Sequence, residues 1–269
     1  MNHVASPLGC LLLVHGGCNN QPGEVNADFN LFDMKLNEWI RCVVAPNNLD
    51  KGELHKITQV DYSKPLNSNA TSKCIIPARK MHVMEAVGLE NIDQHERYNW
   101  VVKQTRSQGF WMFGGQDENG VMHNDLWHIE PFYEENRRLL TSEDQEFVSP
   151  KPALCLNLSQ ARDFSGQPPC PRILAASCVL RNAQGEHLFV IYGGRNDQIF
   201  GGTKNVALND VNIFNTVTRH WSSLAMYGII PSSRWAHIIV PNRQHYSDGF
   251  IVLGGINLNS YCCTKLTTF

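Results

Sequence analysis

Four short apolar stretches of this chain end in a pair of glycines: LLLVHGG at 11–17, FWMFGG at 110–115, LFVIYGG at 188–194 and FIVLGG at 250–255. Runs of aliphatic, β-branched and aromatic residues are typical of buried strands. Paired glycines permit a backbone conformation in which a Cβ would clash, so they indicate a turn. Four copies indicate an internal repeat, and the repeat decides the architecture. The eight glycines are Gly16, Gly17, Gly114, Gly115, Gly193, Gly194, Gly254 and Gly255.

The residues after the glycine pairs also recur at fixed offsets. DFNLFDMKLNEW runs from Asp28 to Trp39, and DVNIFNTVTRHW runs from Asp210 to Trp221. Both place an acid and a Trp 11 positions apart, with an Asp or Asn between them that favours a turn. The second unit keeps Asn-Asp-Leu-Trp at 124–127 but lacks the later Trp. Each segment therefore predicts a strand, a turn and a further strand.

A proline–arginine element precedes three of the glycine pairs. Its copies are PARKMH at 77–82, PRILA at 171–175 and PSSRWAH at 231–237. One position is always arginine, and a histidine follows three residues later in two of the copies. These residues are Arg79, Arg172, Arg234, His82 and His237, with Ala175 in place of the third histidine.

The combined pattern resembles the Kelch repeat, in which each unit forms one blade of a β-propeller with four antiparallel strands over about 50 residues. The resemblance implies an all-β fold and a single propeller region over 1–269, whole or partial, with long loops between blades. It also implies that the three arginines cap and bridge blades, and that Trp39 and Trp221 pack between them. The units are about 8–42, 77–136, 171–222 and 231–269, with insertions at 43–76 and 137–170. A WD40 array is the alternative, although no Trp-Asp dipeptide occurs.

The repeat pattern does not predict a complete ring. Its strands run B-C-D, A-B-C-D, A-B-C-D and A-B, which makes 13 strands. Propellers usually have four to eight blades. The pattern lacks an A strand before Leu11 and the C and D strands after Gly255, where the tail has room for only about one or two short strands. An upstream segment, strands hidden in the insertions, or another polypeptide could fill the gap. Because unpaired strand edges promote association, we expect the isolated chain to be poorly soluble.

Composition limits the classes of function. The chain has 269 residues, 42% of them hydrophobic, and its 23 basic and 25 acidic residues give a net charge of −2. This balance argues against a general nucleic-acid or membrane-surface binder. No apolar run approaches the ~20 residues that span a bilayer. The segment at 8–14 lacks the flanks of a signal peptide, so we expect a cytoplasmic protein, with the cytoskeleton as one setting.

The nine cysteines do not suggest a disulfide framework or a zinc site. Their number is odd, none forms Cys-x-x-Cys, and Cys262 and Cys263 are adjacent. Ordered spacing would be expected for paired disulfides or zinc ligands. Free thiols in a reducing compartment are the preferred interpretation.

No motif for catalysis or cofactor binding occurs. The chain has no Gly-x-Ser-x-Gly, no Gly-x-Gly-x-x-Gly and no phosphate-binding loop. His123 and His128 flank Asn124-Asp125, but five residues along a strand would point them to opposite faces. We therefore expect no catalytic residue, cofactor or metal. A Kelch-fold enzyme, using the recurring arginines, is the weakest alternative.

Three long connections are expected on one rim, where the B–C and D–A links of a propeller lie. Two are the links at 40–76 and 137–170, and the third is the B–C loop at 194–208. Long loops are usually functional or disordered. The candidate partner-binding residues in the B–C loop are Arg195, Asn196, Asp197, Gln198 and Lys204.

The preferred function is a non-enzymatic module that binds other proteins, as a scaffold subunit of a larger assembly. A rigid scaffold with long loops and no catalytic constellation suits this role. The alternative is a substrate-recognition subunit of a ubiquitin ligase, although neither a BTB-like helical domain nor a helical ligase-binding box is recognised in the sequence.

Overall fold

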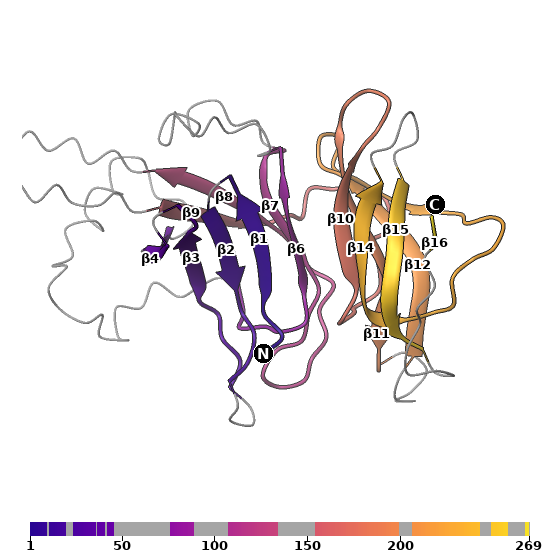
Figure 1. Cartoon of the computed structure of the whole chain (residues 1–269), viewed down its shortest axis with the longest axis horizontal. Helices are drawn as coiled ribbons and strands as arrows, with labels where there is room; N and C mark the ends of the chain where they lie inside the picture. Colours follow the sequence, from indigo (N-terminus) through magenta and orange to yellow (C-terminus); the bar gives the residue numbers. More distant parts are fainter. Residues whose placement is uncertain are drawn as a thin grey trace, which may run out of the picture.

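The computed structural model describes residues 1–9, 11–19, 24–35, 37–40, 42–45, 76–88, 107–133, 154–198, 206–242, 249–257 and 267–268. Every regular element within these residues is a β-strand. The strands form four sheets that follow one another in chain order (Figure 1).

The first sheet has four antiparallel strands in sequence order. They are β1 (Val4–Leu8), β2 (Leu11–His15), β3 (Phe29–Asp33) and β4 (Glu38–Ile40). The prediction that the chain begins on the second strand of a unit, near residue 8, is therefore wrong. β1 pairs only with β2, and an edge strand of this kind tolerates Pro7 because a missing N–H costs little there.

The second sheet has five strands, and two of them lie outside the predicted unit at 77–136. Its strands are β6 (Val83–Val87), β7 (Gly109–Phe113), β8 (Leu126–Tyr133), β9 (Leu154–Gln160) and β5 (Cys42–Ala45). β9 pairs antiparallel with β8, although the sequence suggested an insertion at 137–170. β5 pairs in parallel with β9 at the edge of the sheet.

The third and fourth sheets continue the pattern. The third contains β10 (Ala176–Arg181), β11 (His187–Asn196), β12 (Val206–Asn215) and β13 (His220–Leu224). The fourth contains β14 (Trp235–Asn242), β15 (Gly249–Ile256) and β16 (Thr267–Thr268). β16 is a third strand in a unit for which two were predicted.

The sequence suggested that every glycine pair ends its strand, but two of the strands continue through the pair. β11 and β15 run through their glycines, and the register of β11 against β12 shifts between Tyr192 and Gly194. In β11 the pair therefore marks an irregularity of the β-bulge kind rather than the strand end.

Each sheet packs face to face on the sheet that follows it in the chain. The first strands of successive sheets, β1, β6, β10 and β14, lie side by side. We call the face toward the following sheet the front face and the opposite one the back face. Three buried clusters fill the three interfaces: one around Leu13 and Met112, one around Trp111 and Phe214, and one around Val190 and Phe250.

In the first three sheets, the second glycine of the pair bonds to the segment that leads into the following sheet. The N–H groups of Gly17, Gly115 and Gly194 donate to the carbonyls of Arg79, Arg172 and Arg234 in the following sheet, each at 2.9 Å. The two motifs found in the sequence are thus the two sides of one contact. This contact sets the spacing of successive sheets.

The fold shown is all-β, built from antiparallel sheets of which the first and third have four strands and the second contains a four-stranded antiparallel set. The described residues contain 16 strands rather than the 13 predicted. Within that part of the chain, the fourth sheet does not pack on the first as successive sheets pack on each other, so the arrangement is open.

Candidate functional site

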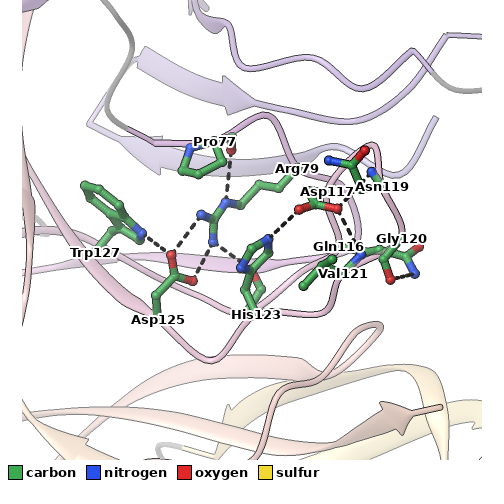
Figure 2. Close-up of polar contacts among 11 residues, drawn as sticks. Pro77, Arg79, Gln116, Asp117, Asn119, Gly120, Val121, His123, Asp125 and Trp127 are labelled. Atoms are coloured by element: carbon green, nitrogen blue, oxygen red, sulfur yellow. Dashed lines mark hydrogen bonds and ion pairs between the residues drawn. The ribbon is translucent and has the colours of Figure 1, made fainter. Parts of the chain in front are cut away.

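The arginine before β6 forms a buried clamp within the second sheet. Arg79 Nε donates to the Pro77 carbonyl at 3.3 Å, and Nη1 donates to the Gly114 carbonyl at 2.9 Å. Figure 2 shows its guanidinium facing Asp125, which accepts two bonds at 2.8 and 2.9 Å and a third from Trp127 Nε1. Burial would raise the pKa of Asp125, but the bonds and charge of Arg79 hold it below its usual value.

The third sheet repeats this clamp. Arg172 donates to the Cys170 and Gly193 carbonyls, and its two Nη atoms donate to Asp210 at 2.8 and 2.7 Å. Burial again opposes ionisation of Asp210, and the Arg172 contacts again lower its pKa. A bidentate arginine–carboxylate pair fixes the geometry as well as the charge.

The fourth sheet has the arginine without the acid. Arg234 donates to the Ser232 carbonyl at 3.0 Å and to the Gly254 carbonyl at 2.9 Å, as the other two arginines do to theirs. Its Nη2 meets only Ser232 Oγ, at 3.3 Å, and no carboxylate contacts it among the residues that the structure describes. All three arginines therefore bond within their own sheets.

The histidines at the repeat position lie in the interfaces between sheets. His82 Nε2 lies 3.0 Å from His15 Nδ1 across the first interface, and His237 packs edge-on against Tyr192 across the third, with ring centroids 5.0 Å apart. Burial, aided by Arg79, lowers the pKa of His15 to about 3, and burial aided by Arg234 lowers that of His237 to about 4. At neutral pH these two histidines are uncharged packing residues.

The two histidines near Asp125 lie in different surroundings, because His123 precedes β8 whereas His128 belongs to it. His123 Nε2 lies 3.3 Å from Asp117 in the turn drawn in Figure 2, whereas His128 contacts the Gln108 carbonyl at 2.7 Å. They do not converge on one ligand. Among the described residues, no group of three or more acidic, histidine or cysteine side chains is placed to hold a metal ion.

The two tryptophans at matching repeat positions have different environments. Trp221 is 2% exposed and packs against Phe113 of the second sheet. Trp39 is 63% exposed, so the prediction that it packs between sheets is wrong. The reason is its place on the back face of the first sheet, which no sheet covers in the described part of the chain.

The predicted partner-binding loop begins three residues later than expected, because Gly194, Arg195 and Asn196 still belong to β11. Arg195 pairs with Asp197 at 2.8 Å and lies over the Trp235 ring at 5.8 Å from its centroid. This contact ties the end of β11 to the start of β14.

The rest of the predicted loop is anchored by Asn196. Its Nδ2 donates to the Pro171 carbonyl at 2.6 Å, and its Oδ1 accepts from the Gln198 amide at 2.7 Å. Asn196 is therefore a structural residue at the base of the loop. The predicted residue Lys204 lies outside the described residues.

An exposed apolar segment follows β13, and it was not among the predicted binding residues. In the β13–β14 connection, Tyr227 is 88% exposed, Ile229 is 94% exposed and Ile230 is 43% exposed. The signal was present in the letters MYGIIP, an apolar run broken by glycine and ended by proline. Large apolar side chains that stand together on a surface mark interaction sites more often than single ones do. We call Tyr227, Ile229 and Ile230 the rim patch.

A carboxyl group lies between the first strands of the second and third sheets. Ser177 Oγ on β10 donates to Glu85 Oε1 on β6 at 2.7 Å. Burial, only partly offset by this bond, raises the pKa of Glu85 from 4.5 to about 7. Its ionisation therefore opposes folding.

Glu85→Gln is expected to stabilise the protein at pH 8 and to have little effect at pH 5. Between pH 4.5 and about 7 the carboxyl is charged in the unfolded chain but protonated in the folded one, so stability falls as pH rises through this window. At 1.36 kcal/mol per pKa unit, the gain from glutamine is up to about 3 kcal/mol. Urea unfolding of the wild type, Glu85→Gln and the exposed control Glu118→Gln at both pH values checks this. Equal gains at the two pH values would contradict it.

Comparisons with known proteins support the fold alone. No family model matches the chain, and no curated protein matches it. Among solved structures, a chain of "Cryo-EM structure of RAG in complex with one melted RSS and one unmelted RSS" matches with a TM-score of 0.57 and 12% identity. The match covers 100% of this chain and 66% of that chain, so this chain spans about two thirds of its length. In the described residues, no helix is long and apolar enough to span a membrane.

Proposed function

We propose that this chain is a Kelch-type β-propeller region, whole or partial, and that it binds other proteins as a non-enzymatic scaffold subunit of a larger cytoplasmic assembly. The sequence pattern of glycine pairs, arginines and late tryptophans supports the family. The repeated arginine and glycine contacts support a rigid scaffold. The matching RAG chain comes from a complex, which agrees with a subunit role.

The observation that carries the proposal is the rim patch. Tyr227 and Ile229 are almost fully exposed, yet the strands on both sides of them are packed in sheets. Aromatic and large aliphatic side chains held on a rigid base lose little entropy on binding and dominate interface energies. The nearby Arg195 and Trp235 are also residue types common in interfaces.

The double substitution Tyr227→Ser and Ile229→Ser is expected to abolish partner capture without changing the melting temperature. Truncating interface anchors typically costs 2 kcal/mol or more each, roughly a thirtyfold loss of affinity. The measurement is quantitative mass spectrometry of proteins retained by the tagged full chain from a lysate.

The matched control is Val217→Ser, at an apolar residue that is 51% exposed in the β12–β13 turn at the opposite end of the third sheet. It should retain the same proteins as the wild type. If the double variant also retains all of them, the rim patch is not the binding site.

A further inference from the structure

The back face of the first sheet carries a row of apolar residues across all four strands. Pro7 on β1 pairs with Leu12 on β2, Leu12 with Phe32 on β3, and Phe32 with Trp39 on β4. Pro7 and Trp39 are exposed, and Leu12 and Phe32 are partly so. An uncovered apolar row of this width is rarely left open to water.

The third sheet has the same row, and there it is covered. Val179, Phe189, Phe214 and Trp221 pair across β10 to β13 in the same order. Phe189 stands four residues before its glycine pair, as Leu12 does. In the third sheet the row packs on the front face of the second sheet, where Trp111 and Phe113 lie. The row is therefore a surface that receives the front face of a preceding sheet.

The fourth sheet has an uncovered front face. Ile238 is 59% exposed and Val240 is 43% exposed, and they pair with Leu253 and Ile251, which are partly exposed. Their equivalents in the third sheet are buried against the fourth sheet: Ala176, Cys178, Val190 and Tyr192 are 6%, 3%, 0% and 0% exposed. In the described residues, the front face of the third sheet is covered by a following sheet, whereas the front face of the fourth sheet is not.

We propose that a second copy of this chain covers both faces, with the fourth sheet of each copy packing on the first sheet of the other. The proposal rests on the proposed function as an interaction module and names the partner of these two faces. Each copy offers one open front face and one open back face, and front-to-back packing already occurs three times within the molecule.

The residues that lead into the first sheet have the same backbone conformation as those that lead into sheets with a packed back face. Asn2 has a φ of 60°, like Met81 at 60° just before β6 and Ala236 at 53° at the start of β14. His3 follows Asn2 as His82 follows Met81. Since His82 meets His15 just before the preceding glycine pair, His3 of the second copy would meet Leu253.

Front-to-back packing between two copies leads to a ring. The two open faces differ, so the contact is head-to-tail, which gives a ring when the rotation closes. Four sheets in each copy make eight in the pair, within the four to eight blades of known propellers.

The test measures the mass of the full chain in solution by light scattering after size-exclusion chromatography. The wild type is expected to contain two chains. Val240→Glu on the open front face and Trp39→Glu on the open back face should each shift the mass to one chain. Both residues are exposed, so neither change disturbs a packed core. Val217→Glu, at the opposite end of the third sheet, should leave two chains.

Mixing the two variants gives the decisive result. Each retains the face that the other has lost, so an equimolar mixture should recover a pair joined by one intact interface. A wild type containing one chain, a mixture that stays at one chain, or an assembly larger than two chains would overturn the proposal. The rim-patch double variant should still pair, so loss of partner capture and loss of pairing are separate outcomes.

Discussion

Arg79→Met is expected to destabilise the protein by about 3–5 kcal/mol, the range typical of breaking a buried ion pair. Arg79 is fully buried and bonds to both oxygens of Asp125 and to the Gly114 carbonyl. Its removal leaves the Gly114 carbonyl without this donor and Asp125 without its cationic partner, with the bond from Trp127 remaining, while methionine replaces only the apolar stem. Urea unfolding at neutral pH measures the loss.

Arg234→Met is the matched control because Arg234 holds the same repeat position with no acid partner in the described residues. In the wild type Arg234 makes only the bonds to the Ser232 and Gly254 carbonyls and to Ser232 Oγ, so its substitution should lower the free energy of unfolding clearly less than Arg79→Met does. Equal losses in the two variants would show that the Asp125 pair contributes nothing to stability. The comparison separates the carboxylate bond from the carbonyl bonds that both arginines make.

Gly115→Val is expected to cost more than about 3 kcal/mol, since two penalties add. Gly115 has a φ of +95°, in which a β-branched residue is strained by about 1–3 kcal/mol. A Cβ would also lie 2.8 Å from His82 Cβ and 2.9 Å from the Lys80 carbonyl. The close approach would push apart the contact between β7 and the turn before β6.

Gly228→Val separates these two penalties. Gly228 has a φ of +79°, but a Cβ there would have no heavy atom within 4 Å. Its variant should show the backbone strain without the clash. Thermal unfolding of both variants gives the difference, and equal melting temperatures would mean that close packing at Gly115 is unimportant.

The elements that could be predicted from the sequence are those with a chemical reason to recur. The glycine pairs and the arginines mark second strands and sheet entries because glycine alone permits the close approach, and arginine alone supplies the fork that holds Asp125. These residues sit at interfaces that repeat. Local sequence therefore carries the order of the four sheets.

The strands that were missed have no such requirement. β1 contains a serine and a proline and lies at an edge, so neither apolar alternation nor a glycine pair announces it. β9 lies 20 residues beyond the end of β8, and its pairing depends on tertiary contacts. Sequence offsets cannot show pairing across such a gap.

The same limit applies to the candidate site. Trp39 and Trp221 have equivalent positions, yet burial depends on whether a neighbouring sheet is present, which the repeat itself does not encode. The rim patch was missed because exposed apolar residues have the same letters as buried ones. Arg195 was predicted as a loop residue because the glycine pair was taken as the end of the strand, whereas β11 continues past it to Asn196.

The position of β5 has a consequence for how the molecule opens. This segment follows the first sheet in the chain but forms its hydrogen bonds on the outer edge of the second, against β9. It covers the longer strand β9 with an edge strand of only 4 residues, which is a poorer template for foreign strands, and it fastens the N-terminal half into one cooperative unit. In a single copy, the described residues give the last sheet one neighbouring sheet and no such fastening, so local unfolding should begin there and spread inward.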